Sequence, residues 1–345
     1  MSPRVLQAFL QAELQPIKSR TLWRELGSSG DEGVQLLRNH RTLSSTEQSR
    51  LESLDLDSLD KAVSSGIRPI GFSAYPETLR NWVDYPIGLF GWGDWSCANA
   101  PTVAIVGTRG ASTYGKAVAM KFAEAFARAG ITVVSGGAIG IDGAAHKGAL
   151  AVGGKTIAVL AGGVDRWYPA IHRGLFQQTR ESGCLISQFA CGVKPNPYRF
   201  LQRNCLIAGL SRATVVIEAP ERSGAIYTAN RANEMGRHVF VVPANIENIN
   251  FRGSHALIRD GAVLVDHPDL VMDALGVLPS ETIEETSPIS EIASKILSNL
   301  STTPLAVEFI LDRTGLPMSD VIGELTLLEL EGRIIHDAGG YALKP

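Results

Sequence analysis

Between residues 101 and 266, short runs of apolar residues alternate with segments in which apolar residues recur at helical spacing. Strands that are apolar on both faces and are separated by helices are typical of a parallel sheet covered by helices on both sides. The sequence therefore predicts an α/β fold with an extended, doubly wound, Rossmann-like sheet, whose ligands bind at the carboxyl ends of the strands. The runs that we assign to strands are TVAIVG, ITVVSGG, KTIAVLAGG, ATVVIEA, HVFVVPA and AVLVD.

The segments on either side follow different patterns, which suggests several domains. Residues 1–65 predict a small domain of short helices, and residues 66–100, rich in glycine, proline and aromatic residues, predict a packed connector within a Rossmann-like domain of residues 66–275. Residues 276–290 are acidic, contain serine and proline and have few apolar residues, so they predict a linker. Residues 291–345 predict three helices and a two-stranded hairpin, which is the pattern of a winged helix.

Composition narrows the class of protein. No run of about 18 apolar residues occurs, so we expect no membrane insertion. The four cysteines form no CxxC pair, which fits a reducing cytoplasm and argues against a zinc site. We therefore expect a cytoplasmic protein without a metal or a cofactor.

The net charge of -3 conceals an uneven distribution along the chain. Residues 1–99 hold 10 Lys/Arg against 12 Asp/Glu, residues 100–275 hold 18 against 12, and residues 276–345 hold 4 against 11. A phosphate backbone needs local cations rather than a basic whole chain. The charge pattern therefore favours anion binding by the middle segment.

The first predicted strand-to-helix turn, residues 107–115, offers an anion site. Its glycines let the backbone approach a ligand, Ser112 or Thr113 can cap the following helix, and Arg109 can bind a phosphate with two parallel hydrogen bonds. The turn is neither GxGxxG nor a Walker loop, and no acidic residue ends the second strand to hold a ribose. NAD is therefore not the expected ligand.

The second such turn, residues 135–142, also places small residues where backbone amides can surround a phosphate. Asp142 and His146 lie four residues apart on one helix face, so they could form an acid–base pair for hydrolysis. Alternatively, Asp142 braces the turn and orients His146. We favour bracing because no nucleophile or set of metal ligands accompanies the two residues.

A later helix begins near Arg203, which could reach a phosphate over the strand ends or remain a solvated surface arginine. Glu218 ends a subsequent strand, and Ser223 with Gly224 opens the helix after it. Lys155 begins the third strand at its amino end, so topology places it away from the expected crevice.

These motifs resemble the DNA-processing protein A (DprA, or Smf) family, in the family's order over nearly all of residues 72–265. RTLWRELGSS resembles the family's N-terminal SAM-like or helix-hairpin module, and GELTLLELEGRIIHDAGGYAL resembles its C-terminal winged helix. The matching elements are YPETL, DYPIGLFGWGD, VAIVGTRGASTYG, VVSGGAIGIDGAAHKGAL, GKTIAVLAGGVDRWYP, RNCLIAGLS, EAPERSGAIYTANRANEMGRHVFVVPANI and LIRDGA.

The resemblance implies a protein that binds single-stranded DNA without catalysing a reaction, dimerises through its Rossmann-like domain and loads the recombinase RecA during natural transformation. From the residues themselves we assign a structural or pocket-bracing role to Asp142, His146, Glu218, Ser223 and Gly224. The implied DNA-binding residues are Gly107, Thr108, Arg109, Ser112, Gly136, Gly137, Lys155, Arg203 and Asn204.

The chain departs from the family pattern at four positions. Ile139 and Cys205 stand where the family usually has arginine, Gln188 where it has glutamate, and Ala244 where it has glycine. Two missing cations predict modest phosphate affinity.

Two other classes of function remain open. One is a nucleotide hydrolase resembling the phosphoribohydrolases, although this chain has no glutamate at the position where their PGGxGTxxE pattern has one. The other is a protein-interaction scaffold with a vestigial pocket, which the missing arginines favour.

The C-terminal module carries an acidic candidate recognition helix, residues 319–331. Its four carboxylates would repel phosphates, so we expect it not to bind DNA. An exposed apolar edge on the helix would suit a protein contact, and the alternative is a module that only adds stability.

Overall fold

The computed structural model describes residues 2–277, 290–330, 333–337 and 339–343. The chain divides into two compact units, residues 1–280 and 281–345. Most of the predicted linker of residues 276–290 lies outside the described residues, and the domain boundaries proposed from the sequence remain predictions. No described helix is long and apolar enough to cross a membrane.

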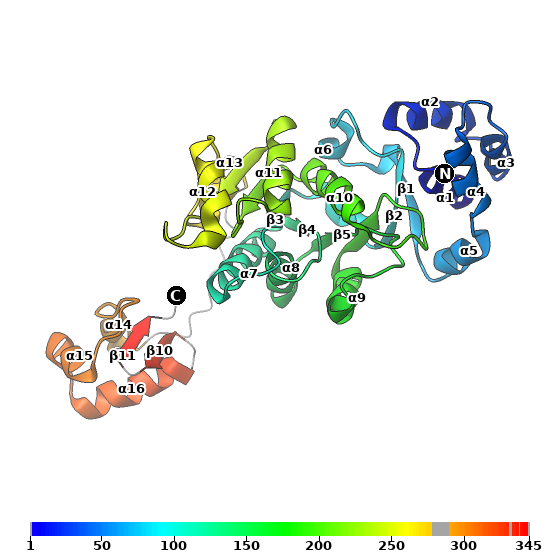
Figure 1. The fold of residues 1–345 in the computed structure, drawn as a ribbon. Helices are drawn as coiled ribbons and strands as arrows, with labels where there is room; N and C mark the ends of the chain where they lie inside the picture. The colour runs from blue at the N-terminus through cyan, green and yellow to red at the C-terminus, as the bar shows by residue number, and fades with distance from the viewer. Residues whose placement is uncertain (1, 278–289, 331–332, 338, 344–345) are drawn as a thin grey trace. The chain divides into compact units, whose positions relative to one another are not determined.

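A nine-stranded sheet forms the centre of the first unit, in the order β1-β2-β6-β5-β4-β3-β7-β8-β9 (Figure 1). The seven strands from β6 to β9 run parallel, whereas β1 and β2 form an antiparallel hairpin, and β2 pairs antiparallel with β6. The strands are β1 (Arg68–Gly71), β2 (Gly88–Gly93), β3 (Thr102–Val106), β4 (Thr132–Ser135), β5 (Thr156–Val159), β6 (Cys184–Ser187), β7 (Ala213–Val216), β8 (His238–Val241) and β9 (Val263–Leu264).

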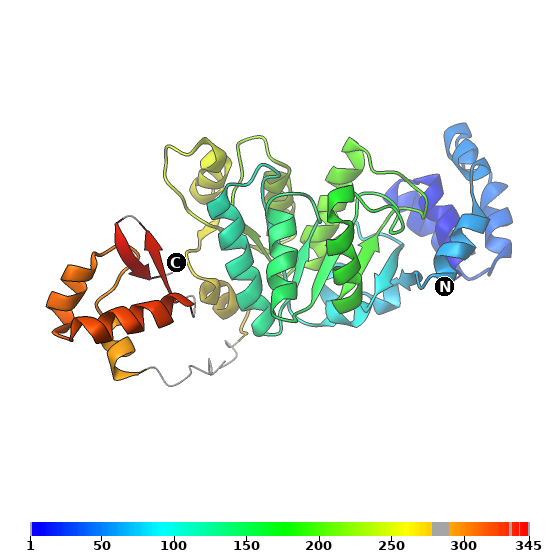
Figure 2. The ribbon, with the colours of Figure 1, turned by 90° about the horizontal axis from the view of Figure 1, so that it is seen from below.

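Helices cover both faces of this sheet (Figures 1 and 2). On one face lie α7 (Thr113–Arg128), α8 (Ile141–Ala151) and α9 (Arg173–Ser182), and on the other lie α10 (Pro197–Leu210) and α11 (Gly224–Glu234). Every residue of β3, β4, β5 and β7 is buried, as a strand between two helical layers requires. The predicted α/β class with an extended, doubly wound sheet is confirmed.

The sequence pattern missed three of these strands. The first two, β1 and β2, lie in the segment that we interpreted as a connector, because glycine and proline interrupt its apolar residues. The third, β6, has only three consecutive apolar residues, Cys184 to Ile186, between Gly183 and Ser187, so it lacks the longer apolar run that marks the other central strands. The shorter helices of this unit are η1 (Phe72–Ala74), α6 (Glu77–Arg80), η2 (Trp95–Asn99), η3 (Ala170–His172), η4 (Ile249–Phe251), α12 (Arg252–Arg259) and α13 (Pro268–Ala274).

Five N-terminal helices pack beside the hairpin edge of the sheet, and their core is continuous with that of the sheet. The side-chain amide of Gln7 is buried; its Nε2 donates to the carbonyl of Cys191 at 2.9 Å and its Oε1 accepts from the amide of Cys191 at 2.9 Å. Glu13 forms an ion pair of 2.5 Å with Arg199 at the start of α10. The helices are α1 (Pro3–Ala12), α2 (Pro16–Leu26), α3 (Glu32–Arg38), α4 (Ser45–Glu52) and α5 (Leu56–Ser64).

The second unit has three helices and a two-stranded hairpin, so the prediction of a winged helix is confirmed. Its core gathers apolar side chains from all three helices and from the hairpin, among them Ile296, Ile310, Leu325 and Ile334. The hairpin pairs antiparallel, with Ile334 opposite Leu343. The elements are α14 (Glu291–Leu297), α15 (Val307–Thr314), α16 (Met318–Leu330), β10 (Ile334–Asp337) and β11 (Gly340–Leu343).

Candidate functional site

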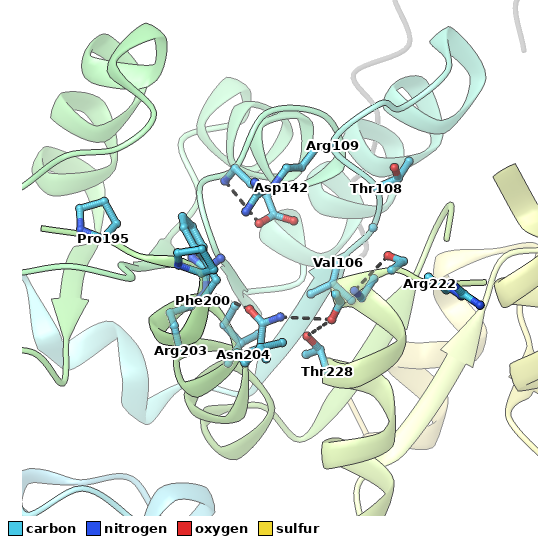
Figure 3. Close-up of a pocket in the computed structure, with 18 of the residues that line it drawn as sticks. Val106, Thr108, Arg109, Asp142, Pro195, Phe200, Arg203, Asn204, Arg222 and Thr228 are labelled. Carbon is cyan, nitrogen blue, oxygen red and sulfur yellow. Dashed lines mark hydrogen bonds between the residues drawn. The ribbon is translucent and has the colours of Figure 1, made fainter. Parts of the chain in front are cut away.

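A crevice of about 710 Å³ opens at the carboxyl ends of the central strands (Figure 3). From β3 the chain adds β4, β5 and β6 in succession on one side of β3, and then adds β7, β8 and β9 on its other side. The strand order therefore reverses between β3 and β7, where the crevice lies. Ligands of doubly wound sheets bind at such a point. The crevice is lined by the turn after β3, the turn before α8, the start of α10 and the loop before α11.

The first turn is filled by a carboxylate of the protein itself. Ser112 caps α7 by accepting a hydrogen bond from the amide of Gly115 at 3.0 Å. The amide and the hydroxyl of Ser112 then donate to the carboxylate of Glu218, at 3.0 and 2.7 Å. Glu218 is 0% exposed, so this carboxylate holds a position at the helix N-terminus where an anionic ligand would otherwise be stabilised.

The second turn is closed in the same way. The Asp142 carboxylate accepts hydrogen bonds from the amides of Gly136 at 3.2 Å and Ala138 at 3.3 Å. Burial raises the pKa of Asp142, while the nearby Arg203 guanidinium acts in the opposite direction.

Arg203 braces this turn from the other side. It is 4% exposed, and its Nη1 donates to the carbonyls of Gly136 at 2.5 Å and Val159 at 2.6 Å. Burial lowers the pKa of Arg203 to about 10, which leaves it charged at neutral pH. A side chain at Gly136 would place its Cβ 2.5 Å from the guanidinium, which explains the glycine.

These contacts correct two expectations from the sequence. The Ser112, Gly136 and Ala138 amides donate to internal carboxylates, so the turns are not open cradles for phosphate. Arg203 was expected to reach over the strand ends or to lie solvated on the surface, but it is buried because the carbonyls and Asp142 compensate its charge.

Two arginines and two aromatic rings remain at the crevice wall. The guanidinium of Arg109, an exposed residue, lies 4.7 Å from the ring centroid of Phe200, and Tyr168 meets the same ring edge-on at 5.9 Å. Arg222, also exposed, stands on the loop before α11, across the crevice from Phe200 (Figure 3). Sequence reasoning missed Phe200, Tyr168 and Arg222, because nothing in their local pattern distinguishes them from ordinary surface residues.

His146 faces the sheet rather than the crevice. Its Nδ1 lies 2.7 Å from the hydroxyl of Thr156, which itself donates to the carbonyl of Val133, so the ring donates through Nδ1. Burial lowers the pKa of His146 to about 3. The ring is neutral at physiological pH and contributes to packing, which favours bracing over an acid–base pair with Asp142.

The other predicted residues divide between the crevice and elsewhere. Gly107, Thr108, Asn204, Ser223 and Gly224 all line the crevice. Asn204 receives a bond from Arg203 at 3.0 Å and donates to the carbonyl of Gly224 at 3.1 Å, while Ser223 caps α11. Gly137 adopts a positive φ of 68° beside the crevice.

Two positions are not brought to the crevice. Lys155 directly precedes β5, at the amino edge of the sheet, so the structure does not bring it to the crevice. Cys205 faces the opposite side of α10, where its thiol lies 3.4 Å from the hydroxyl of Tyr227. Ile139, 45% exposed, does stand on the second turn.

The fold and this crevice together define an extended Rossmann-like protein with a cationic, aromatic site at the strand ends. Residues 68–276 match the family model described as DNA recombination-mediator protein A, and residues 280–340 match the DprA winged helix domain. The chain belongs to the DNA recombination-mediator protein A family.

Relatives in several bacteria support this membership. Protein Smf of Escherichia coli is 38% identical over 283 residues, which cover 79% of this chain and 76% of Smf. The putative DNA processing protein DprA of Mycobacterium tuberculosis (strain CDC 1551 / Oshkosh) is 41% identical over 236 residues, 66% of this chain and 61% of that protein.

Two solved structures are also similar. DNA processing protein A of Streptococcus pneumoniae superposes with a TM-score of 0.68 at 30% identity, covering 79% of this chain and 98% of that chain. DNA processing protein A of Helicobacter pylori, solved for its single-stranded DNA binding mode, gives a TM-score of 0.56 at 27% identity over 61% of this chain and 95% of that chain.

We predict that Arg203→Met destabilises the protein by about 3–5 kcal/mol, because it leaves the Asp142 carboxylate buried without its cation. Urea unfolding at pH 7 measures the loss. Arg222→Met, at an exposed arginine of the same crevice, is the matched control and should change stability by less than about 0.5 kcal/mol. Equal effects in the two variants would contradict the bracing role.

We also predict that His146 makes the protein less stable as the pH falls. The folded state keeps the ring neutral, whereas an unfolded histidine protonates near its ordinary pKa of about 6.5. Below that pH the unfolded state binds one more proton, so the His146 contribution falls by about 1.4 kcal/mol per pH unit toward the folded pKa of about 3. Urea unfolding of the protein and of His146→Gln at pH 7.5, 6.5 and 5.5 tests this, and an unchanged slope in the variant would refute it.

Proposed function

We propose that the protein binds single-stranded DNA in this crevice without catalysing a reaction, and that it loads the recombinase RecA onto DNA taken up in natural transformation. The observation that carries the DNA-binding part is the Arg109–Phe200 stack beside Tyr168. A flat cation stacked on a half-buried ring, with the exposed Tyr168 beside it, suits the bases and backbone of a single strand, because every base has a face that can stack.

The charge distribution supports the same ligand. Residues 100–275 carry a surplus of six positive charges, and the exposed Arg109 and Arg222 concentrate part of it at the crevice. Cations along a groove attract the phosphate backbone regardless of sequence.

The closed turns favour a strand over a mononucleotide. A nucleotide hydrolase of this fold class would use the turn amides to hold its phosphate, but here Glu218 and Asp142 accept those hydrogen bonds. His146, the candidate partner of Asp142 in acid–base chemistry, is committed to Thr156. These hydrogen bonds support a non-catalytic role.

The RecA partnership rests on family membership.

A homodimer through the Rossmann-like domain is supported by β9, an edge strand whose two residues, Val263 and Leu264, are 51% and 47% exposed. An exposed apolar edge strand is suited to pairing with a second copy. Sedimentation of a Leu264→Lys variant tests this contact.

We predict that Arg109→Ala weakens binding of a 20-residue oligothymidine and reduces the slope of log affinity against log salt by about 0.7, the value for one phosphate contact on a single strand. Phe200→Leu should cost about 1–3 kcal/mol of stacking while leaving the salt slope unchanged. Fluorescence anisotropy at several salt concentrations measures both. Lys121→Ala, at an exposed cation on α7, is the control, and variants indistinguishable from it would rule out the crevice.

We predict that Ile139→Arg tightens single-strand binding, because it adds a cation on the exposed second turn. Cys205→Arg should instead destabilise the protein without tightening binding, because position 205 is 8% exposed and faces away from the crevice. The same titration, after a circular dichroism check of folding, compares the two. Tighter binding by the Cys205 variant would show that our assignment of the crevice wall is incorrect.

We predict that deleting residues 281–345 leaves duplex affinity nearly unchanged. In α16, Asp320 and Glu329 are exposed, and so are the apolar Ile322 and Leu327. Exposed carboxylates repel phosphate, and exposed apolar side chains suit a protein contact. Titrations with duplex and single strands, with sedimentation for self-association, test this; a large drop in duplex affinity would overturn it.

A further inference from the structure

A second cleft, of about 620 Å³, lies at the opposite edge of the sheet from the crevice. It is formed where β3, β7 and β8 begin, between the short helix α6 and the end of α13. Its volume is within the range of small-ligand sites. We call it the amino-edge cleft, and its polar lining includes three arginines, Arg80, Arg212 and Arg237, the amides of Asn81 and Asn99, and one carboxylate, Glu77.

The arginines of the amino-edge cleft lack anionic partners. Arg80 and Arg212 are exposed, and in the described part of the chain neither side chain forms a hydrogen bond or an ion pair. Arg237 donates from Nη2 to the carbonyl of Thr78 at 2.8 Å, but its buried Nε has no acceptor. Three guanidiniums therefore line one cleft with much of their donor capacity unused.

This arrangement carries an electrostatic cost. Burial lowers the pKa of Arg237, the nearby carboxylate of Glu77 raises it, and the like charge of Arg212, a smaller effect than that of Glu77, lowers it. Helix C-termini at this edge favour nearby cations, because the helix dipole is negative there. That attraction accounts for cations at this edge, but it leaves the buried Nε of Arg237 without an acceptor.

We propose that the amino-edge cleft is a second anion site, which takes phosphate groups. A phosphate between Arg212 and Arg237 would give Arg212 an anionic partner and would supply the missing acceptor of the Arg237 Nε. Planar guanidiniums bind phosphate oxygens through paired hydrogen bonds, and the amides of Asn81 and Asn99 add neutral donors. The phosphate can come from a nucleic-acid backbone or from a free phosphorylated small molecule.

The amino-edge cleft is separate from the crevice and does not depend on the function proposed for it. The two sites lie at opposite ends of β3 and β7, which span about 15 Å at roughly 3.3 Å per residue. A strand held in the crevice would have to pass around the sheet to reach the cleft, so the cleft would engage a different segment or a different molecule.

The first experiment uses pyrophosphate as the probe and thermal unfolding of the full chain as the readout. The Arg109→Ala background weakens the crevice as a competing anion site. We expect pyrophosphate to raise the melting temperature in this background, and adding Arg80→Ala with Arg212→Ala to abolish the rise. No rise in the background, or an equal rise after the two added changes, would overturn the proposal.

Matched variants separate loss of charge from loss of folding. Arg80→Lys with Arg212→Lys keeps both charges and should retain part of the rise, whereas Lys121→Ala should retain all of it. The alanine pair removes exposed, unpartnered side chains, so its melting temperature without pyrophosphate should not fall. If the melting temperature falls and the near-ultraviolet circular dichroism is lost, the alanine pair is misfolded and the lysine pair provides the test instead. A lysine pair whose melting temperature responds to pyrophosphate no more than that of the alanine pair would count against the site.

A second experiment identifies the source of the phosphate. With a 20-residue oligothymidine, a backbone ligand predicts that Arg80→Ala with Arg212→Ala lowers the salt slope by about 1.4, for two contacts. An unchanged slope, with pyrophosphate binding intact in the Arg109→Ala background, assigns the cleft to a free phosphorylated molecule. Because Arg109→Ala tests the crevice separately, failure of one site is distinguishable from failure of the other.

Discussion

The rest of the crevice depends on a pair of opposite buried charges, Asp142 and Arg203, that brace the second turn from its two sides and attract each other electrostatically. Removing two charges from water is costly, and here the cost is offset by compensation on every side: amides of the second turn bind Asp142, and carbonyls of that turn and of β5 bind Arg203. The pair thus joins α8, α10 and the ends of two strands. It also explains why Gly136 must lack a side chain.

Glu218 performs a corresponding task at the first turn. Its carboxylate comes from the strand end of β7 and binds the Ser112 cap of α7, while its own carbonyl accepts from the amide of Thr108 at 2.7 Å. Both turns therefore hold their shape through internal anions rather than through a ligand. The crevice is organised before anything binds, which reduces the entropy that binding must overcome.

The sequence was sufficient to predict most strands of the sheet, but not the side chains that line the crevice. Continuous apolar runs identified β3, β4, β5, β7 and β8, because burial on both faces leaves a signal in every residue. The same reasoning located the two glycine-rich turns and their residues. It favoured Asp142, six residues from Gly136, as the brace of the second turn, but it could not show that Glu218 binds Ser112, because the two lie 106 residues apart along the chain. Phe200 was missed for a similar reason, since its role arises from the proximity of Arg109 in space.

The contacts of the N-terminal helices have a mechanical consequence for the crevice wall. The loop from Cys191 to Asn196 leads directly into α10, which carries Phe200. Gln7 of α1 binds Cys191 at one end of this loop, and Glu13, the residue after α1, pairs with Arg199 in the first turn of α10. The N-terminal helices therefore fix the position of this loop relative to the sheet. A partner that displaced α1 would break these contacts and free the start of α10, including Phe200, to move. Ligand release from the crevice would then be coupled to binding of that partner at the N-terminal helices.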